Sequence, residues 1–423
     1  MENQRTFEQS IVNTSISEDK LSKNEDEEIV IDPTHGYCIL QFNSVFSAIS
    51  NLVMCKTCGK NITFNQASPQ GLGFKIAIIC ECGNSYINSG PMIGNAFEIN
   101  RRIVAVMRLL GIGIRGVDFF CSLMDLIRKF HSQIFIECLS NFWTAVESIC
   151  KFSMQKAVEE EKKLTLKEEG SETNLAVSGY CTWEDKRGPN SERFGVVTLE
   201  GIYSNKIIDS YVGSLRCSDC MSWEREKIED PPRYKTWLLQ HDICDIMSEE
   251  LATYQKACYV RFMFDRSIDN YEVKYIRYID DSATCKELVN FDPYDVPVEI
   301  LEFQDNNTPY NIDIYNGLLW HFAPQHLRSG RQTIELSSYL ATSILNDGYS
   351  SILKMFDKMG IVIGPVAGDY IADRDDKRLR EADDRQWAAN SKEGSSEGGK
   401  ALATLQVLFE EEKGAFYELG IAD

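Results

Sequence analysis

The chain has 423 residues, of which 43% are hydrophobic, and a formal net charge of −20. This length allows two or three domains with separate cores, and the ordinary globular composition excludes a chain that is disordered throughout. No apolar run reaches the roughly 18–20 residues that a membrane span requires, and the polar segment from Met1 to Asn24 does not resemble a secretory signal peptide, so we expect a soluble intracellular protein.

Residues 1–36 are predicted to be a disordered acidic leader. They contain the run SEDKLSKNEDEE and few apolar side chains that a core could bury. Segments of low hydrophobicity and high charge do not bury enough apolar surface to offset the entropy lost on folding. The first globular region is therefore expected to begin near Tyr37.

Residues 37–170 are predicted to form a zinc-ribbon-like and helical region. Cys55 and Cys58 make one close pair, and Cys80 and Cys82 make a second. A strand-like hairpin is predicted between the two pairs, and the segment FKIAIICECG forms its returning strand. Structural Zn2+ binds four ligands tetrahedrally, and two turns that each supply two thiolates form such a site. The second pair is one residue shorter than a usual knuckle, and two reduced cysteine pairs in a loop are the alternative.

Three helical segments follow in this region. The first, FEINRRIVAVMRLLGIG, is predicted to be amphipathic and to end at glycine, with a core face of Ile103, Val106, Met107 and Leu110. Two more helices are predicted over VDFFCSLMDLIRKF and SNFWTAVESICKFSMQKAVEEEKK. Three cysteines among apolar neighbours are expected to be small core residues: Cys121, Cys138 and Cys150. The domain boundary is expected in the charged run EEEKKLTLKEEGSETN.

Residues 171–372 are predicted to form a layered α/β domain. An antiparallel meander is predicted by three short strand-like runs, LAVSGYCTW, RFGVVTLEGIY and KIIDSYVGS. Then follow a helix over SEELATYQKACYVRFMFDRS, strands over EVKYIRYIDDS and VPVEILEF, and helices over LSSYLATSILND and YSSILKMFDKMG. Strands that alternate with helices indicate an α/β fold. The remaining residues, 373–423, are predicted to be a charged linker from Asp373 to Lys400 and a short terminal segment.

A second cysteine-rich cluster lies within the α/β domain. Cys217 and Cys220 are followed by His241 and Cys244, and the intervening MSWEREKIEDPPRYKTWLLQ has the length of a zinc-finger loop. Mixed cysteine and histidine at this spacing predicts a second structural Zn2+ site. The alternative is a surface or helix-capping His241 with thiols that bind nothing.

Acidic residues stand where strands are predicted to end. Asp281 follows Asp280 directly after EVKYIRYI, and further acids of the right type are Asp209, Glu302 and Asp313. Two-metal phosphoryl chemistry needs several carboxylates from separate elements that converge on ions about 3.5–4 Å apart. By spacing alone, these acids are also consistent with ordinary solvated strand ends.

Taken in chain order, several of these segments resemble the Mutator-like transposase domain found in animal genomes. The first cysteine pair, GLGFKIAIICECG and FEINRRIVAVMRLLGIG are similar to its N-terminal region. Its stretch built around Asp-Gly-Thr-Trp, Arg-Gly and a Gly-Val-Val strand is similar to VSGYCTWEDKRGPNSERFGVVTLEGIYSNKIIDSYV. The resemblance continues through RCSDC, HDIC, FMFDRSIDNYEVKYIRYIDDS, NIDIYNGLLWHFAP and SILNDGYSSILKMFDKMGIVIGP.

The resemblance implies a ribonuclease H-like mixed sheet with flanking helices and a zinc-knuckle insertion. It also implies an Asp-Asp-Glu triad that holds two Mg2+ for DNA strand cleavage and transfer. Position by position, the first Asp falls on Tyr180, the second on Asp281 and the Glu on Asp313, while Cys181 replaces the Gly after the first Asp. A phenol with a pKa near 10 stays neutral at pH 7, so we expect a transposase by descent in which Mg2+ is ancestral and strand transfer is lost.

The resemblance further implies DNA as the ancestral partner and a nuclear location. The net charge of −20 argues against tight phosphate binding, which depends on Lys and Arg, and a basic stretch that follows VEILEF in the family is nearly absent here. Six basic residues are candidates for DNA contact, with ordinary solvated surface as the alternative for each: Arg101, Arg102, Lys186, Arg187, Arg328 and Arg331. Two other functional hypotheses are a domesticated zinc-binding module that contacts DNA or protein, and an unexpressed relic.

Overall fold

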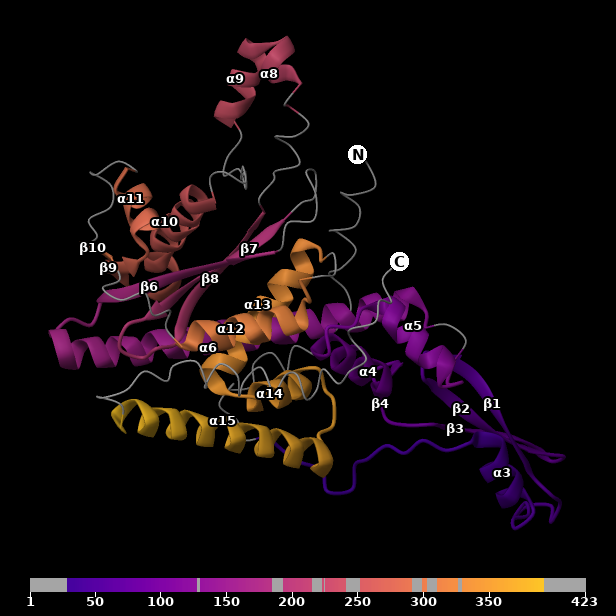
Figure 1. Cartoon of the computed structure of the whole chain (residues 1–423). Coiled ribbons are helices and arrows are strands. Elements are labelled where there is room, and N and C mark those ends of the chain that lie inside the picture. Colours follow the sequence, from indigo (N-terminus) through magenta and orange to yellow (C-terminus); the bar gives the residue numbers. More distant parts are fainter. Residues whose placement is uncertain are drawn as a thin grey trace. The chain divides into compact units, whose positions relative to one another are not determined.

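The computed structural model describes residues 29–127, 130–184, 193–214, 223, 225–240, 252–290, 299–302, 310–325 and 329–391. The chain divides into two compact units, Met1–Pro365 and Val366–Asp423, and the sheets lie in the first (Figure 1). Within the described ranges, no helix combines the length and the apolar character needed to cross a membrane.

The first unit begins earlier than predicted. Most of the acidic leader lies outside the described residues, but Ile31 forms a parallel β-bridge with Ile363, and the backbone N–H of Asp32 donates to the carbonyl of Ile363 at 2.8 Å. The end of the leader is therefore paired with a distant segment of the same unit, a contact that local composition does not reveal.

The N-terminal ribbon is a three-stranded antiparallel sheet preceded by a helix. Its elements are α3 (Phe42–Ser50), β1 (Thr63–Gln70), β2 (Gly73–Cys80) and β3 (Gly83–Asn88), with the strands paired in that order. The aromatic ring of Phe46 in α3 packs on Phe64 in β1, with ring centroids 5.1 Å apart. The predicted hairpin between the two cysteine pairs is confirmed, and a third strand extends it.

Two short strands and three helices follow: β4 (Met92–Ile93), β5 (Ala96–Phe97), α4 (Glu98–Leu109), α5 (Ile114–Leu123) and α6 (Ser132–Glu169). The predicted face of α4 is only partly right, because Met107 is buried but Val106 and Leu110 are 37% and 53% exposed. The buried face is instead centred on Val104 and includes Asn100, whose side chain is hydrogen-bonded to the backbone of the ribbon. A polar residue whose hydrogen bonds are satisfied can be buried. The buried face of α4 therefore does not follow the positions of the apolar residues alone.

Three cysteines in these helices are confirmed as core residues. Cys121, Cys138 and Cys150 are 0%, 4% and 0% exposed. Burial raises the pKa of the Cys150 thiol to about 12, so it stays neutral and packs like an apolar side chain.

The charged run that was expected to mark a boundary is helical. Helix α6 continues through it to Glu169 and ends at Gly170, which has the left-handed conformation that glycine favours (φ 76°). Within the run, the buried carboxylate of Glu161 accepts hydrogen bonds from the backbone N–H groups of Tyr203 and Ser204 at 3.1 and 2.7 Å. The end of α6 therefore supports a turn of the main sheet.

The main sheet is mixed and has five strands. They are β6 (Asn174–Trp183), β7 (Phe194–Gly201), β8 (Ile207–Ser214), β9 (Lys274–Asp280) and β10 (Glu299–Glu302), in the order β10-β9-β6-β7-β8. Strands β6, β7 and β8 form the predicted antiparallel meander, whereas β9 runs parallel to β6 and β10 runs parallel to β9. Every residue of β7 is buried, as expected of a central strand covered on both faces. The predicted mixed α/β architecture is confirmed.

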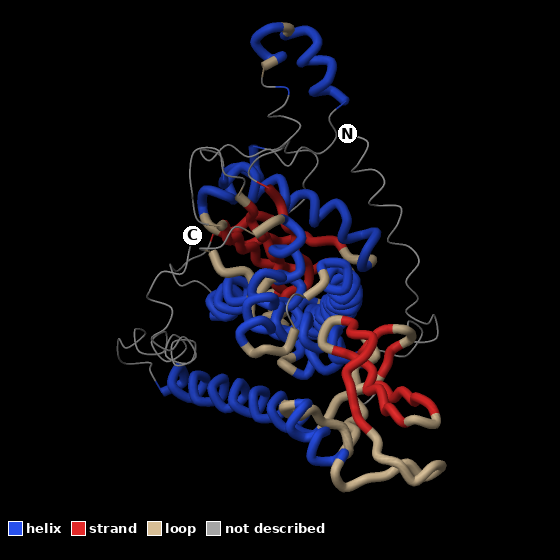
Figure 2. Tube along the Cα trace, turned by 90° about the vertical axis from the view of Figure 1, so that its right-hand side faces the viewer, coloured by secondary structure: helices blue, strands red, loops and turns tan. Residues whose placement is uncertain are grey.

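Helices cover both faces of this sheet (Figures 1 and 2). The further elements of the domain are α10 (Ala252–Tyr271), α11 (Ser282–Asn290), α12 (Tyr310–Phe322), α13 (Arg331–Asp347) and α14 (Ser350–Lys358). Helix α10 packs on β7, β8 and β9 from one side, while α6 and α13 pack on β7 and β8 from the other. The main core combines residues of the sheet with Val260 and Met263 of α10, both fully buried.

The predicted linker from Asp373 to Lys400 is largely helical instead. Helix α15 extends from Pro365 to Ser391 and makes up the described part of the second unit. Alternating charges at helical spacing explain the helix, since pairs such as Arg378 and Asp375 (3.6 Å) lie three residues apart on its surface. Residues 392–400 lie outside the described part.

One buried amide ties α13 to the start of β8. The side chain of Asn346 accepts from the backbone N–H of Ile207 at 2.9 Å and donates to its carbonyl at 2.8 Å. Asn346 is only 6% exposed, so both hydrogen bonds are shielded from water.

Replacement of Asn346 by alanine is expected to lower the free energy of unfolding by about 2–4 kcal/mol, because two buried backbone groups lose their partners. Urea unfolding followed by circular dichroism measures the loss. Asn270→Ala, at an exposed position of α10, is the control with the same change in helix propensity. If both variants lose the same free energy of unfolding, the two hydrogen bonds between Asn346 and Ile207 do not stabilise the fold.

Candidate functional site

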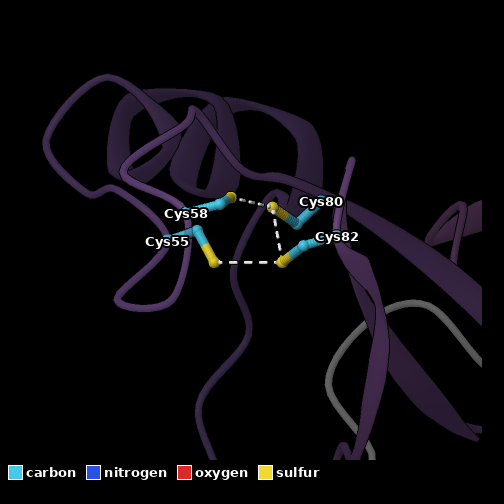
Figure 3. Close-up of side chains that lie close together, drawn as sticks. All are labelled: Cys55, Cys58, Cys80 and Cys82. Carbon is cyan, nitrogen blue, oxygen red and sulfur yellow. Dashed lines mark hydrogen bonds between the residues drawn. The ribbon is translucent and has the colours of Figure 1, made fainter.

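Four cysteine thiols converge at the end of the ribbon (Figure 3). The Sγ atoms of Cys55 and Cys82 are 3.5 Å apart, those of Cys58 and Cys80 are 3.3 Å apart, and all four lie within 4.8 Å of one another. A tetrahedral zinc ion with Zn–S bonds of about 2.3 Å requires sulfur atoms about 3.8 Å apart. The four cysteines are therefore close enough to bind a metal ion such as zinc.

Local backbone geometry explains this convergence. In the first turn, the backbone N–H of Cys55 donates to the carbonyl of Lys60 at 2.8 Å, and Gly59 takes the left-handed conformation (φ 69°). In the second turn, Cys80 pairs with Gly83 across a two-residue hairpin turn that contains Cys82. The unusually short spacing of the second pair is thus a consequence of the tight turn between β2 and β3, and it does not argue against a metal site.

The thiols differ in their affinity for protons. Backbone N–H groups, first that of Cys58, lower the pKa of Cys55 to about 6, whereas the hydrogen bond that Cys82 donates to Cys80 raises the pKa of Cys82 to about 12. One thiolate is therefore favoured at neutral pH before any cation is bound. A cation would have to displace the protons of Cys80 and Cys82, whose pKa values are raised, which makes binding dependent on pH.

Tyr180 lies near the carboxyl end of β6 and is held by α12. The side-chain amide of Asn316 donates to its hydroxyl oxygen, and Trp320 donates to the hydroxyl of Thr182 at 3.1 Å on the same face. Burial raises the pKa of Tyr180, and the charge of nearby Asp313 acts in the same direction. The phenol is therefore neutral at physiological pH.

Asp281 lies directly beyond the end of β9, the parallel neighbour of β6. The last paired residues of the two strands are Ser178 and Ile279, and Tyr180 and Asp281 each stand two residues further along. They therefore stand at equivalent positions of adjacent parallel strands. Asp313, in the first turn of α12, is exposed.

Asp281 and its neighbour Asp280 form an ion pair with a lysine that the sequence analysis did not single out. The ammonium nitrogen of Lys256 in α10 is 2.5 Å from Asp280 Oδ1 and 2.8 Å from Asp281 Oδ2. Burial raises the pKa of Asp280 to about 6. Burial also acts to raise the pKa of Asp281, but hydrogen bonds from Lys256 and the Thr284 backbone outweigh it and hold that pKa below its ordinary value.

The position of Lys256 on α10 indicates from the sequence that its side chain is buried and needs a partner. It precedes Val260 by four residues and Met263 by seven, and all three are buried. A lysine on the apolar stripe of a helix needs an acidic partner, and the adjacent acids at the end of the next predicted strand, Asp280 and Asp281, were candidates.

The other acids considered as metal ligands have structural partners. Asp209 in β8 is buried against Arg266 of α10, with Nε of Arg266 3.1 Å from Oδ2. Burial raises the pKa of Asp209, and the guanidinium offsets only part of that shift. Glu302, at the end of β10, is exposed and accepts a hydrogen bond from the Ser282 hydroxyl at 2.9 Å.

The structure describes three of the six candidate DNA-binding residues. Arg101 donates to the carbonyl of Met359 at 2.6 Å, and Arg102, with a side chain 16% exposed, forms an ion pair with Glu98 at 2.7 Å. Arg331 is exposed at the start of α13, near Glu335. The remaining three candidates, Lys186, Arg187 and Arg328, lie outside the described residues. DNA contact by any of the six stays a prediction.

The second cysteine-rich cluster, Cys217, Cys220, His241 and Cys244, also lies outside the described residues. Between its two halves, the structure describes helices α8 (Glu226–Glu229) and α9 (Pro231–Gln240). The rings of Trp223 and Trp237 are stacked, with centroids 4.9 Å apart and an interplanar angle of 7°, and the Arg233 guanidinium lies 5.3 Å from the Trp223 ring. This aromatic contact brings together two residues that lie close in sequence to the two halves of the predicted site.

One known family matches more than half of the chain. The family model described as Mutator-like transposase matches residues 36–307, which include the ribbon, α4 to α6 and the whole of the main sheet. No curated protein and no solved structure shows a match to the chain.

The ion pair predicts a specific dependence of stability on pH. Because the folded-state pKa of Asp281 lies below its ordinary value of 3.8, its contribution to stability is complete above that value and is lost as the pH falls below it. The difference in unfolding free energy between the wild type and Asp281→Asn should therefore shrink below pH about 4.

Urea unfolding at pH values between 6 and 2.5 measures this difference, and Asp265→Asn, an exposed position of α10, is the matched control for the loss of one carboxylate. A difference that stays constant over the whole pH range would rule out a stabilising ion pair at Asp281.

Proposed function

The chain belongs to the Mutator-like transposase family, and from this we infer that it is a transposase-derived protein that no longer cleaves or joins DNA strands. The observation that carries the proposal is the neutral Tyr180 at the position where the family has its first catalytic Asp. Its hydroxyl is engaged by Asn316, and burial raises its pKa, so it supplies no negative charge to a metal site.

The fold that we propose for the main domain is ribonuclease H-like. Support comes from the strand order β10-β9-β6-β7-β8, with an antiparallel meander followed by two strands parallel to its first member. In this arrangement, the ends of β6 and β9 are the elements expected to carry the first two acids, and α12 the third. The residues at those positions are Tyr180, Asp281 and Asp313.

The residues present do not fit two Mg2+ ions. Ions that share carboxylates need several negative charges close together, and one of the three expected groups is a neutral phenol. Asp281 is already paired with the ammonium of Lys256. Loss of a single hydrogen-bond donor to a transition state already lowers kcat by about 10²–10³-fold, and groups that act as a unit cannot be removed singly without losing most of the catalysis.

We propose zinc as the cation of the four-cysteine cluster. Soft thiolates select zinc over Mg2+, and the sulfur spacing and tight turns support a closed tetrahedral site. We propose the second cluster, Cys217, Cys220, His241 and Cys244, as a zinc knuckle of the insertion. The stacking of Trp223 on Trp237 supports this, because it holds the two flanking segments close to one another.

A second candidate function is a zinc-binding module that contacts DNA or a protein partner in the nucleus. The observation that favours it is the convergence of four thiols while the catalytic acids are incomplete. The net charge of −20 favours a protein partner over DNA. Binding to duplex DNA that weakens steeply with salt would favour the DNA version.

The purified protein is expected to show no nicking or joining of supercoiled or linear duplex DNA in the presence of Mg2+ or Mn2+. The physical reason is the missing charge at Tyr180, and gel analysis of the DNA measures the result. Asp281→Ala is the control for contaminating nucleases. Cleavage that is present in the wild type and disappears in Asp281→Ala would overturn the proposed loss of activity.

Cys58→Ser is expected to remove about one zinc equivalent per chain and to lower the melting temperature, because binding of a structural zinc ion is coupled to folding. Metal analysis and differential scanning fluorimetry measure the two effects. Cys38→Ser is the matched control, since Cys38 is exposed and lies outside the cluster. Equal zinc content in the two variants would show that the four thiols do not hold the metal.

A further inference from the structure

The side chain of Lys256 lies between two acids at the end of β9. Its ammonium nitrogen is within hydrogen-bonding distance of both carboxylates, 2.5 Å from Asp280 and 2.8 Å from Asp281. The side chains of Lys256 and Asp280 are 10% and 2% exposed, while that of Asp281 is 52% exposed. One positive and two negative groups of the same chain therefore lie together at the carboxyl end of β9.

Each of the four carboxylate oxygens accepts at least one hydrogen bond from the chain itself. Asp280 Oδ1 also accepts from the backbone N–H of Asp281 at 2.7 Å, and its Oδ2 accepts from the Tyr278 hydroxyl. Both oxygens of Asp281 accept from Thr284, Oδ1 from the backbone N–H and Oδ2 from the hydroxyl, each at 2.8 Å. A divalent cation would have to displace several of these donors to bind.

We propose that Lys256 is a built-in cation. Its ammonium takes the place between Asp280 and Asp281 that a divalent cation would need, and it turns a former metal-binding edge into a structural ion pair. This inference rests on the proposed function and deepens it, because the missing acid at Tyr180 is then one of two obstacles to metal binding. A Mg2+ ion, which binds oxygen at about 2.0–2.1 Å, would be repelled by the ammonium that already contacts Asp281 Oδ2.

The ion pair also joins three elements of the domain. Lys256 belongs to α10, Asp280 ends β9, and Asp281 immediately precedes α11. Two carboxylates this close repel one another unless a positive charge lies between them. Since Lys256 supplies that charge, the carboxylates of Asp280 and Asp281 are stabilised next to one another without any added ion.

The consequence is that restoring the first acid alone does not restore a metal site. We expect that neither the zinc-loaded wild type nor Tyr180→Asp binds Mn2+ in titrations followed by electron paramagnetic resonance. Tyr180→Asp combined with Lys256→Met should bind Mn2+ at least about tenfold more tightly than Tyr180→Asp, because a repelling charge is removed. Tyr180→Asp combined with Lys286→Met is the matched control, since Lys286 is exposed on α11.

The outcomes separate this inference from the proposed function. If Tyr180→Asp binds Mn2+ as tightly as its combination with Lys256→Met, or if that combination gains nothing, the inference on Lys256 is wrong and the proposed loss of activity stands. If the wild type binds Mn2+ and cleaves DNA, the proposed function itself fails.

A second measurement uses the wild-type side chain and does not depend on the folding of a Lys256 variant. Reductive methylation followed by peptide mass spectrometry should label Lys256 much more slowly than Lys286. Asp281→Asn should raise the labelling rate of Lys256 several-fold and leave that of Lys286 unchanged. Equal labelling of the two lysines in the wild type would overturn the inference.

Discussion

Charge balance at the carboxyl ends of β6 and β9 is the constraint on which the rest of the structure depends. Two carboxylates at the edge of a buried sheet require a compensating positive charge, and α10 supplies it through Lys256. Helix α12 contacts β6 through Asn316, whose side-chain amide donates to the phenol oxygen of Tyr180. Both helices are therefore held to the sheet by side chains of the chain, at the strand ends where we propose that the metal site of the family lay.

The proposed loss of catalysis is physically compatible with retention of the fold. A carboxylate at position 180 would be a buried charge next to Asp313 and would need a cation, whereas the phenol needs only one hydrogen-bond partner and finds it in Asn316. The apolar core between the sheet and α10 does not depend on either acid. The ribbon carries its own cluster of four thiols, which lies at a distance along the chain from these groups.

Sequence patterns predicted the strands well, because period-two alternation and turn residues are local signals. The meander, the strand that ends at Asp280 and the hairpin between the cysteine pairs all followed from such signals. The features that were predicted wrongly or not at all have a common cause, because each depends on contacts with residues that are distant in the sequence. The buried face of α4 depends on Asn100 contacting the ribbon, and the charged end of α6 is helical and buried where Glu161 binds a turn of the sheet. Lys256 was missed for the same reason, since its acidic partners come from another element.

The most direct test of the central claim is a crystal structure of the wild-type protein grown in Mn2+, with anomalous diffraction used to locate metal ions. The account predicts a zinc signal at the four cysteines, no manganese signal at Asp281, and the ammonium of Lys256 between Asp280 and Asp281. A manganese ion bound to Asp281 and Asp313, with Lys256 displaced or another carboxylate in the place of Tyr180, would contradict it.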